Sequence, residues 1–167
     1  MTKKDVKLKI KSVQRSGIPG DKDEQLEILT DAVINASKEK ISVEYDELLS
    51  DDGAPTRTVL LFEREKPETV FLSRNGDVKM TCVIEEKTRY RFTYDIGVAA
   101  LELVCVGQSV KNELSDNGGK LSVKYDIEAR GVTVQSCELS VTSSLKQQKM
   151  CAETYFPHTF LLMYKVL

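Results

Sequence analysis

Apolar and polar residues alternate at every second position through much of this chain. The alternation is strict in residues 6–11 (VKLKIK) and 121–128 (LSVKYDIE), and residues 90–94 (YRFTY) repeat it with aromatic side chains. Successive side chains on a β-strand point to opposite faces, so each segment has one dry and one solvated face. The pattern therefore predicts half-buried strands, with helix confined to a minor part of the chain.

Turn-forming residues separate these runs at intervals of roughly 8–12 residues, as in sandwiches and barrels. They include Asn75-Gly76, Asp95-Ile96-Gly97 and Arg130-Gly131, where Gly and Asn supply the positive φ of tight hairpin turns. Further strands are expected at residues 40–49, 56–64, 69–74, 80–86, 100–110 and 132–142. The length of 167 residues matches one domain. We expect a single all-β domain with antiparallel neighbours.

Two of the expected strands are apolar on both faces, namely residues 59–62 (VLLF) and 103–106 (LVCV). A strand of this kind is typical of a central position with both faces covered. We therefore expect another element over the outer side of these two strands.

Residues 21–40 fit two structures. Leu26, Leu29, Val33 and Ala36 recur at helical steps after an acidic first turn, which predicts a helix. Alternation in residues 26–32 predicts a strand, but the adjacent Val33 and Ile34 interrupt it. Periodicity alone slightly favours the helix.

Residues 70–80 (VFLSRNGDVKM), 92–97, 101–103 (LEL) and 119–126 (GKLSVKYD) resemble the YwiB-like family of uncharacterised bacterial proteins, which is similar to the calycins. The resemblance runs from about Val6 to Thr142. It implies an antiparallel, lipocalin-like barrel of 8–10 strands without an established biochemical role. It also implies that residues 25–35 form a strand.

The chain departs from that family at two places. Tyr94-Asp95-Ile96 precedes Gly97, where the family has a Thr-Pro type of turn, and the chain continues for 25 residues after Thr142. We therefore divide it into a barrel domain, residues 1–143, and a C-terminal extension, residues 144–167. The extension can cap the barrel, bind a partner or lie outside the fold.

Composition argues against several classes of function. Lysines and arginines number 24 against 26 aspartates and glutamates, so a net charge of −2 gives no general attraction to nucleic acid. The lysine row formed by Lys3, Lys4, Lys7, Lys9 and Lys11 is typical of an exposed strand that resists edge pairing. The N-terminus has no signal-peptide pattern, and no apolar run is long enough to span a membrane. We expect a cytoplasmic protein.

The chemistry-bearing residues do not form a catalytic set. The four cysteines lack paired C-x-x-C spacing and His158 is the only histidine, so neither a zinc site nor another bound cofactor is expected. Glu85 and Glu86 are adjacent on a strand and point apart, which prevents them from sharing a proton. The motif of a hydrolase, a phosphate loop or a dinucleotide site is missing. An enzyme is therefore not favoured.

The aromatic row gives the candidate site. An eight-stranded barrel holds side chains or one small ligand in its interior. Tyr90, Phe92, Tyr94 and Tyr125 are expected to face inward, and Arg74, beside a turn at the barrel mouth, could reach an anionic head group. We predict a binder of a small apolar or amphipathic ligand. The alternative is a filled, non-catalytic barrel whose outer face or extension contacts a protein partner or a second copy.

Overall fold

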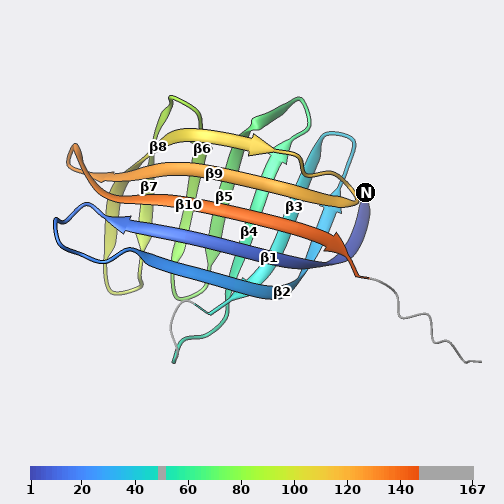
Figure 1. Ribbon diagram of the computed structural model, residues 1–167, viewed down its shortest axis with the longest axis horizontal. Helices are drawn as coiled ribbons and strands as arrows, with labels where there is room; N and C mark the ends of the chain where they lie inside the picture. Colours follow the sequence, from blue (N-terminus) through green and yellow to red (C-terminus); the bar gives the residue numbers. More distant parts are fainter. Residues whose placement is uncertain (49–51, 147–167) are drawn as a thin grey trace, which may run out of the picture.

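The chain, with its alternating side chains, forms ten antiparallel strands in the computed structural model, which describes residues 1–48 and 52–146 (Figure 1). The strands are β1 (Thr2–Ser16), β2 (Glu24–Ala36), β3 (Lys40–Glu47), β4 (Thr56–Glu63), β5 (Lys66–Asn75), β6 (Lys79–Glu85), β7 (Arg89–Asp95), β8 (Ala100–Asn112), β9 (Gly118–Ala129) and β10 (Val132–Leu145). Each pairs with its neighbours in sequence, and β1 pairs with β10 to close the barrel. The expected lipocalin-like barrel is confirmed.

The uncertain segment at residues 21–40 is a strand, as the family resemblance implied, and the helix suggested by periodicity is wrong. β2 pairs with β1 residue by residue from Glu24 to Ala36. Ala32, Ile34 and Ala36 face the core, while Val33 is half-buried on the outer side. Pairing with a neighbouring strand outweighs the weak local preference for helix.

The last strand extends slightly past the expected domain boundary. β10 ends at Leu145, which pairs with Val6, and Ser144 pairs with Lys7. Ser144 and Leu145 therefore belong to the barrel and not to the extension that we placed at 144–167. Residues 147–167 of that extension lie outside the described residues.

The inner faces of the strands form one apolar cluster, which includes Leu8, Ile34, Leu60, Leu72 and Leu121. The strands that are apolar on both faces are not covered on the outside by another element, contrary to expectation, within residues 1–48 and 52–146. Their outward side chains, Val59, Leu61, Val104 and Val106, are half-buried among neighbours on the sheet surface.

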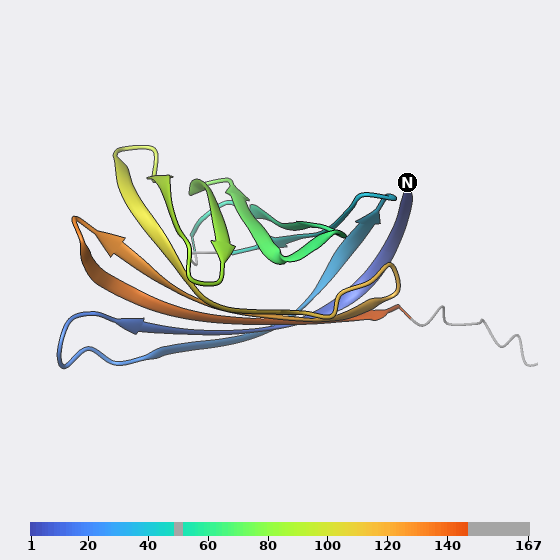
Figure 2. The ribbon, with the colours of Figure 1, turned by 90° about the horizontal axis from the view of Figure 1, so that it is seen from above.

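Two ends of the barrel differ in shape. The turns after β1, β3, β5, β7 and β9 surround the end opposite the N-terminus, which we call the distal mouth. There the β1–β2 and β9–β10 hairpins project beyond the shorter strands (Figure 2). The part of the chain that the structure describes has no helix with the length and apolar character of a membrane span.

Candidate functional site

The distal mouth holds a cleft of about 780 Å³. We call it the mouth cleft. Its lining comes from the ends of β1, β2, β3, β5 and β7 and the turns beside them: Ser12, Gln14, Glu24, Gln25, Leu26, Glu47, Leu48, Arg74, Asp77, Val78, Tyr94 and Ile96. A volume of this size suits a small organic molecule, since ligand pockets span roughly 300–1,000 Å³.

A buried ion pair lies in this cleft. Arg74 alternates with the buried Val70 and Leu72 on β5, so it faces the barrel interior, and Glu47 likewise follows the buried Tyr45 on β3. The Nε atom of Arg74 donates to Oε1 of Glu47 at 2.9 Å, and their side chains are 20% and 7% exposed. Burial is the largest influence and opposes the charge on Arg74, but Glu47 together with Tyr125 and Tyr45 outweighs it, so that the pKa of the guanidinium is raised.

Thr58 completes this polar group from the next strand. Its hydroxyl donates to the same Glu47 oxygen at 2.5 Å. Among the described residues, neither terminal nitrogen of Arg74 has a hydrogen-bond partner. Arg74 is therefore held in place through Nε, while its two terminal nitrogens remain free to bind a carboxylate or phosphate oxygen.

The rest of the cleft is mixed, with apolar side chains beside the polar Ser12, Gln14, Glu24, Gln25 and Asp77. Leu26, Leu48 and Ile96 are 54%, 64% and 42% exposed, which is high for side chains of this kind. Tyr94 is half-buried and packs against the core. The cleft therefore combines apolar patches with polar side chains and with Arg74 as its oriented cation, an arrangement that fits an amphipathic molecule.

Buried tyrosines and thiols lie close enough to Arg74 to interact with its charge. Desolvation raises the pKa of Tyr125 well above its ordinary value, and desolvation likewise raises the pKa of Cys137 to about 11. The Cys82 side chain, as a hydrogen-bond partner, raises the pKa of Cys105. Cys82, Cys105 and Cys137 are free and buried. The raised pKa values keep Tyr125, Cys105 and Cys137 neutral at ordinary pH, so the charge near them comes from the Arg74–Glu47 pair.

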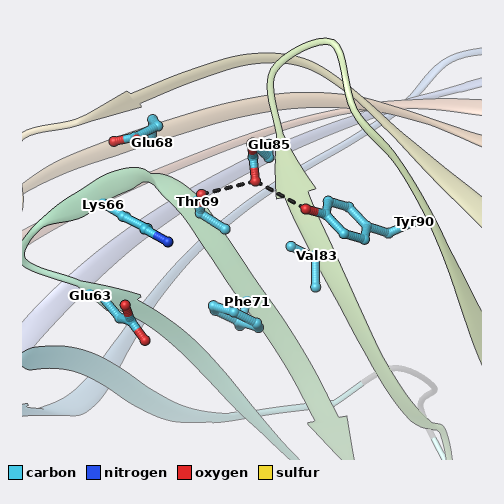
Figure 3. Close-up of a pocket in the computed structure, with 8 residues that line it drawn as sticks. All are labelled: Glu63, Lys66, Glu68, Thr69, Phe71, Val83, Glu85 and Tyr90. Carbon is cyan, nitrogen blue, oxygen red and sulfur yellow. Dashed lines mark hydrogen bonds between the residues drawn. The ribbon is translucent and has the colours of Figure 1, made fainter.

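A second hollow, of about 360 Å³, lies on the outer face of β5 and β6 (Figure 3). Thr69, Phe71, Val83 and Glu85 line it and alternate along their strands with buried residues. The hydroxyl groups of Tyr90 and Thr69 each donate to Oε2 of Glu85 at 3.1 Å. The carboxylate of Glu85, as hydrogen-bond partner, raises the pKa of Tyr90.

The candidate residues are therefore divided among three places. Arg74 and Tyr94 line the mouth cleft, and Phe92 and Tyr125 belong to the buried core. Tyr90 lines the outer hollow, which differs from the expected inward row of Tyr90, Phe92 and Tyr94. β6 and β7 form only one bridge, Lys79–Asp95, so the ring of Tyr90 can reach the outer face of β6.

Sequence reasoning missed Glu47, although a signal was available. Glu47 continues the alternation of Val43 and Tyr45, which places a carboxylate on an inward position. An inward acid predicts a buried partner, because an isolated buried charge is very costly. Only the barrel shows that the partner is Arg74, 27 residues further along the chain.

The remaining charged features have local partners. Lys7 pairs with Asp31 at 2.5 Å, and Lys9 and Lys11 both pair with Glu27, at 2.7 and 3.4 Å. Three lysines of the β1 row are thus matched by acids on β2, while Lys4 donates to the side-chain oxygen of Asn117. Residues 1–48 and 52–146 contain no group of three or more His, Cys, Asp or Glu side chains placed to hold a metal ion, and His158 lies outside them.

Comparison with known proteins identifies the fold. The family model described as "Domain of unknown function (DUF1934)" matches residues 8–141. The crystal structure of the ywiB protein from Bacillus subtilis is similar, with a TM-score of 0.68 and 20% identity over 85% of this chain and 93% of that one. No curated protein sequence matches.

Proposed function

The chain belongs to the DUF1934 family, whose function is unknown, and we propose that its mouth cleft binds a small amphipathic molecule with a carboxylate or phosphate head group. The head group contacts Arg74. The apolar part lies against Leu26, Leu48, Ile96 and Tyr94, which line the same cleft.

One observation carries this proposal, namely the Arg74–Glu47 pair inside a barrel whose core is mainly apolar. A buried ion pair contributes little to stability, and well-packed apolar residues of similar volume often replace it without loss. Its presence in the cleft therefore supports a role in binding. Glu47 and Thr58 fix the guanidinium in one orientation, which lowers the entropic cost of capturing an anion.

The proposal includes a cytoplasmic location in a bacterium. Cys82, Cys105 and Cys137 are free thiols in the core, which agrees with a reducing compartment. Binding in the cleft requires no proton transfer or covalent step. Under this proposal the protein is a carrier or sensor of its ligand and not an enzyme.

The test is calorimetric titration with decanoate, kept below its micelle-forming concentration, alongside decanol and decylamine as neutral and cationic probes of equal chain length. We expect decanoate to bind most tightly. Arg74→Gln should weaken decanoate binding about tenfold or more, because charged hydrogen bonds contribute about 1.5–3 kcal/mol. Decanol binding should change little.

Arg57→Gln is the matched control, since Arg57 is a half-exposed arginine paired with Glu44 and Asp46 on the outer face. Circular dichroism and thermal unfolding verify that both variants fold. Equal decanoate affinity in the wild type and the folded Arg74→Gln protein would refute the assignment of Arg74. Failure of all three probes to bind would refute the amphipathic ligand class.

A second candidate function is protein interaction, and a specific observation favours it. Within residues 1–48 and 52–146, one edge of β2 lacks a neighbouring strand over much of its length. This edge offers main-chain groups to another strand, independently of any ligand in the mouth cleft.

A further inference from the structure

β2 is half unpaired on one side. It pairs with β1 over its full length, from Glu24 to Ala36, but pairs with β3 only from Ala32 to Ala36. In the part of the chain that the structure describes, residues 24–31 have no strand on their second edge. Figure 1 shows this stretch as the lower border of the sheet. Its outward main-chain donors and acceptors can pair with another extended strand.

This free edge lacks the usual protection against strand addition. Natural edge strands carry lysine, proline or a bulge that blocks pairing. Residues 24–31 (EQLEILTD) contain none of these, and Leu26 and Leu29 are 54% and 76% exposed. The acidic side chains of Glu27 and Asp31 are already paired with lysines of β1. Among the described residues, Glu24 at the start of the segment is its one acid without an ion-pair partner.

We propose that the free edge of β2 pairs with the same edge of a second copy of this chain, as antiparallel strands related by a two-fold axis at Ile28. An axis perpendicular to the sheet keeps inward residues on the inner face in both copies. Paired residues must then both have even numbers or both have odd numbers, because side chains alternate between faces. The axis must consequently pass through a residue.

The charges of the segment select Ile28 for that position. With Ile28 opposite itself, Leu26 lies opposite Thr30, Glu27 opposite Leu29, and Gln25 opposite Asp31. No like charges face each other. Moving the axis to residue 27 places Glu27 opposite itself, and moving it to residue 29 places Glu27 opposite Asp31. Both arrangements are unfavourable because they bring like charges opposite each other. The segment is therefore self-complementary in this one central register.

The pairing also extends the mouth cleft. Leu26 lies on the inner face and lines the cleft, so the partner's Leu26 continues the same inner face beyond Ile28. This consequence rests on the proposed ligand site, whereas the pairing itself does not. Ligand titration and mass measurement separate the two: a dimer that binds no probe refutes only the ligand proposal.

The first test uses sedimentation equilibrium of the full chain over a range of concentrations. We expect a reversible dimer. Leu29→Glu should raise the dissociation constant about tenfold, because the two-fold axis creates the new repulsion with Glu27 twice. Leu29→Lys should dimerise at least as well as the wild type, since it places a cation opposite Glu27. Val98→Glu is the control, on a turn residue that is 92% exposed.

The second test traps the register. Ile28→Cys in a Cys151→Ser background places two thiols across the axis, with Cβ atoms about 5 Å apart. Oxidised glutathione should convert it to a covalent dimer faster than Thr30→Cys in the same background, whose partner residue is Leu26. A monomer at every concentration refutes the pairing. Equal effects of Leu29→Glu and Leu29→Lys, or faster cross-linking at residue 30, refute the register.

Discussion

Tyr45 shows how an inward position controls the chemistry of a side chain. It is 2% exposed, beside Glu47 on the same face of β3. Burial raises the pKa of its phenol, and the negative charge of Glu47 raises it further. Tyr125 is in the same state on β9, where desolvation is again the main cause of the raised pKa. Both phenols remain protonated as long as the barrel stays folded.

This burial predicts the response of the protein to alkali. Unfolded tyrosine ionises near pH 10, while the folded tyrosines keep their protons. Above pH ~10 the unfolded chain therefore binds fewer protons, so the free energy of unfolding falls as pH rises and is unaffected by these groups below that range. Tyr45→Phe should make this fall shallower by up to ~1.4 kcal/mol per pH unit. Urea unfolding across alkaline pH measures it, and an unchanged slope would contradict the assignment.

β8 makes direct main-chain contact with the turn between β6 and β7. The amide of Lys87 donates to the carbonyl of Gly107 at 3.0 Å, and the amide of Gly107 donates to Thr88 at 3.1 Å. A Cβ atom on Gly107 would lie 2.0 Å from the carbonyl oxygen of Glu85. Glycine at this position allows the two segments to approach where the β6–β7 ladder is nearly absent.

Gly107→Ala should therefore destabilise the barrel by about 2–3 kcal/mol, because the obstructing atoms are main chain and cannot rotate away. Urea unfolding measures the change. Gly131→Asn is the control, since nothing lies within 4 Å of the added Cβ and asparagine tolerates the positive φ of that turn. Similar losses in both variants would show that close approach at Gly107 is not the cause.

Closure of the whole molecule depends on β1, which pairs with β2 on one side and with β10 on the other. The first and last described strands are thus neighbours. The barrel therefore cannot close until β1 and β10 are both present and paired. All ten strands lie between Thr2 and Leu145. The stability of the fold should accordingly depend on the chain up to Leu145.

A chain that ends at Lys146 should unfold within about 0.5 kcal/mol of the full chain, as is usual for changes away from buried contacts. A chain that ends at Leu139 should not fold, because it loses the β10 residues that pair with both β1 and β9. Thermal and urea unfolding compare the three chains. A large loss in the chain ending at Lys146 would give residues 147–167 a role in the fold.

Much of the architecture could be predicted from the sequence, because a two-residue period has a direct physical meaning. It assigned the inward faces of residues 6–11 and 121–128 correctly. It failed at residues 21–40, where helical spacing competed with alternation. It also failed at Tyr90, because alternation predicts an inward side chain and cannot show that β6 and β7 share only one bridge. Both depend on neighbours distant in the sequence.

Side-chain alternation and turn residues by themselves determined that this protein is an all-β domain of antiparallel strands with one apolar face each, because they fix which face each residue presents. The family resemblance implied that the strands close into a barrel. Only the tertiary structure decided that Arg74 meets Glu47 and that a cleft opens at the distal mouth. It also decided that residues 24–31 of β2 have no second neighbour among the described strands. Those features depend on where strands of unequal length end beside one another. Strand alternation carries no information about that alignment.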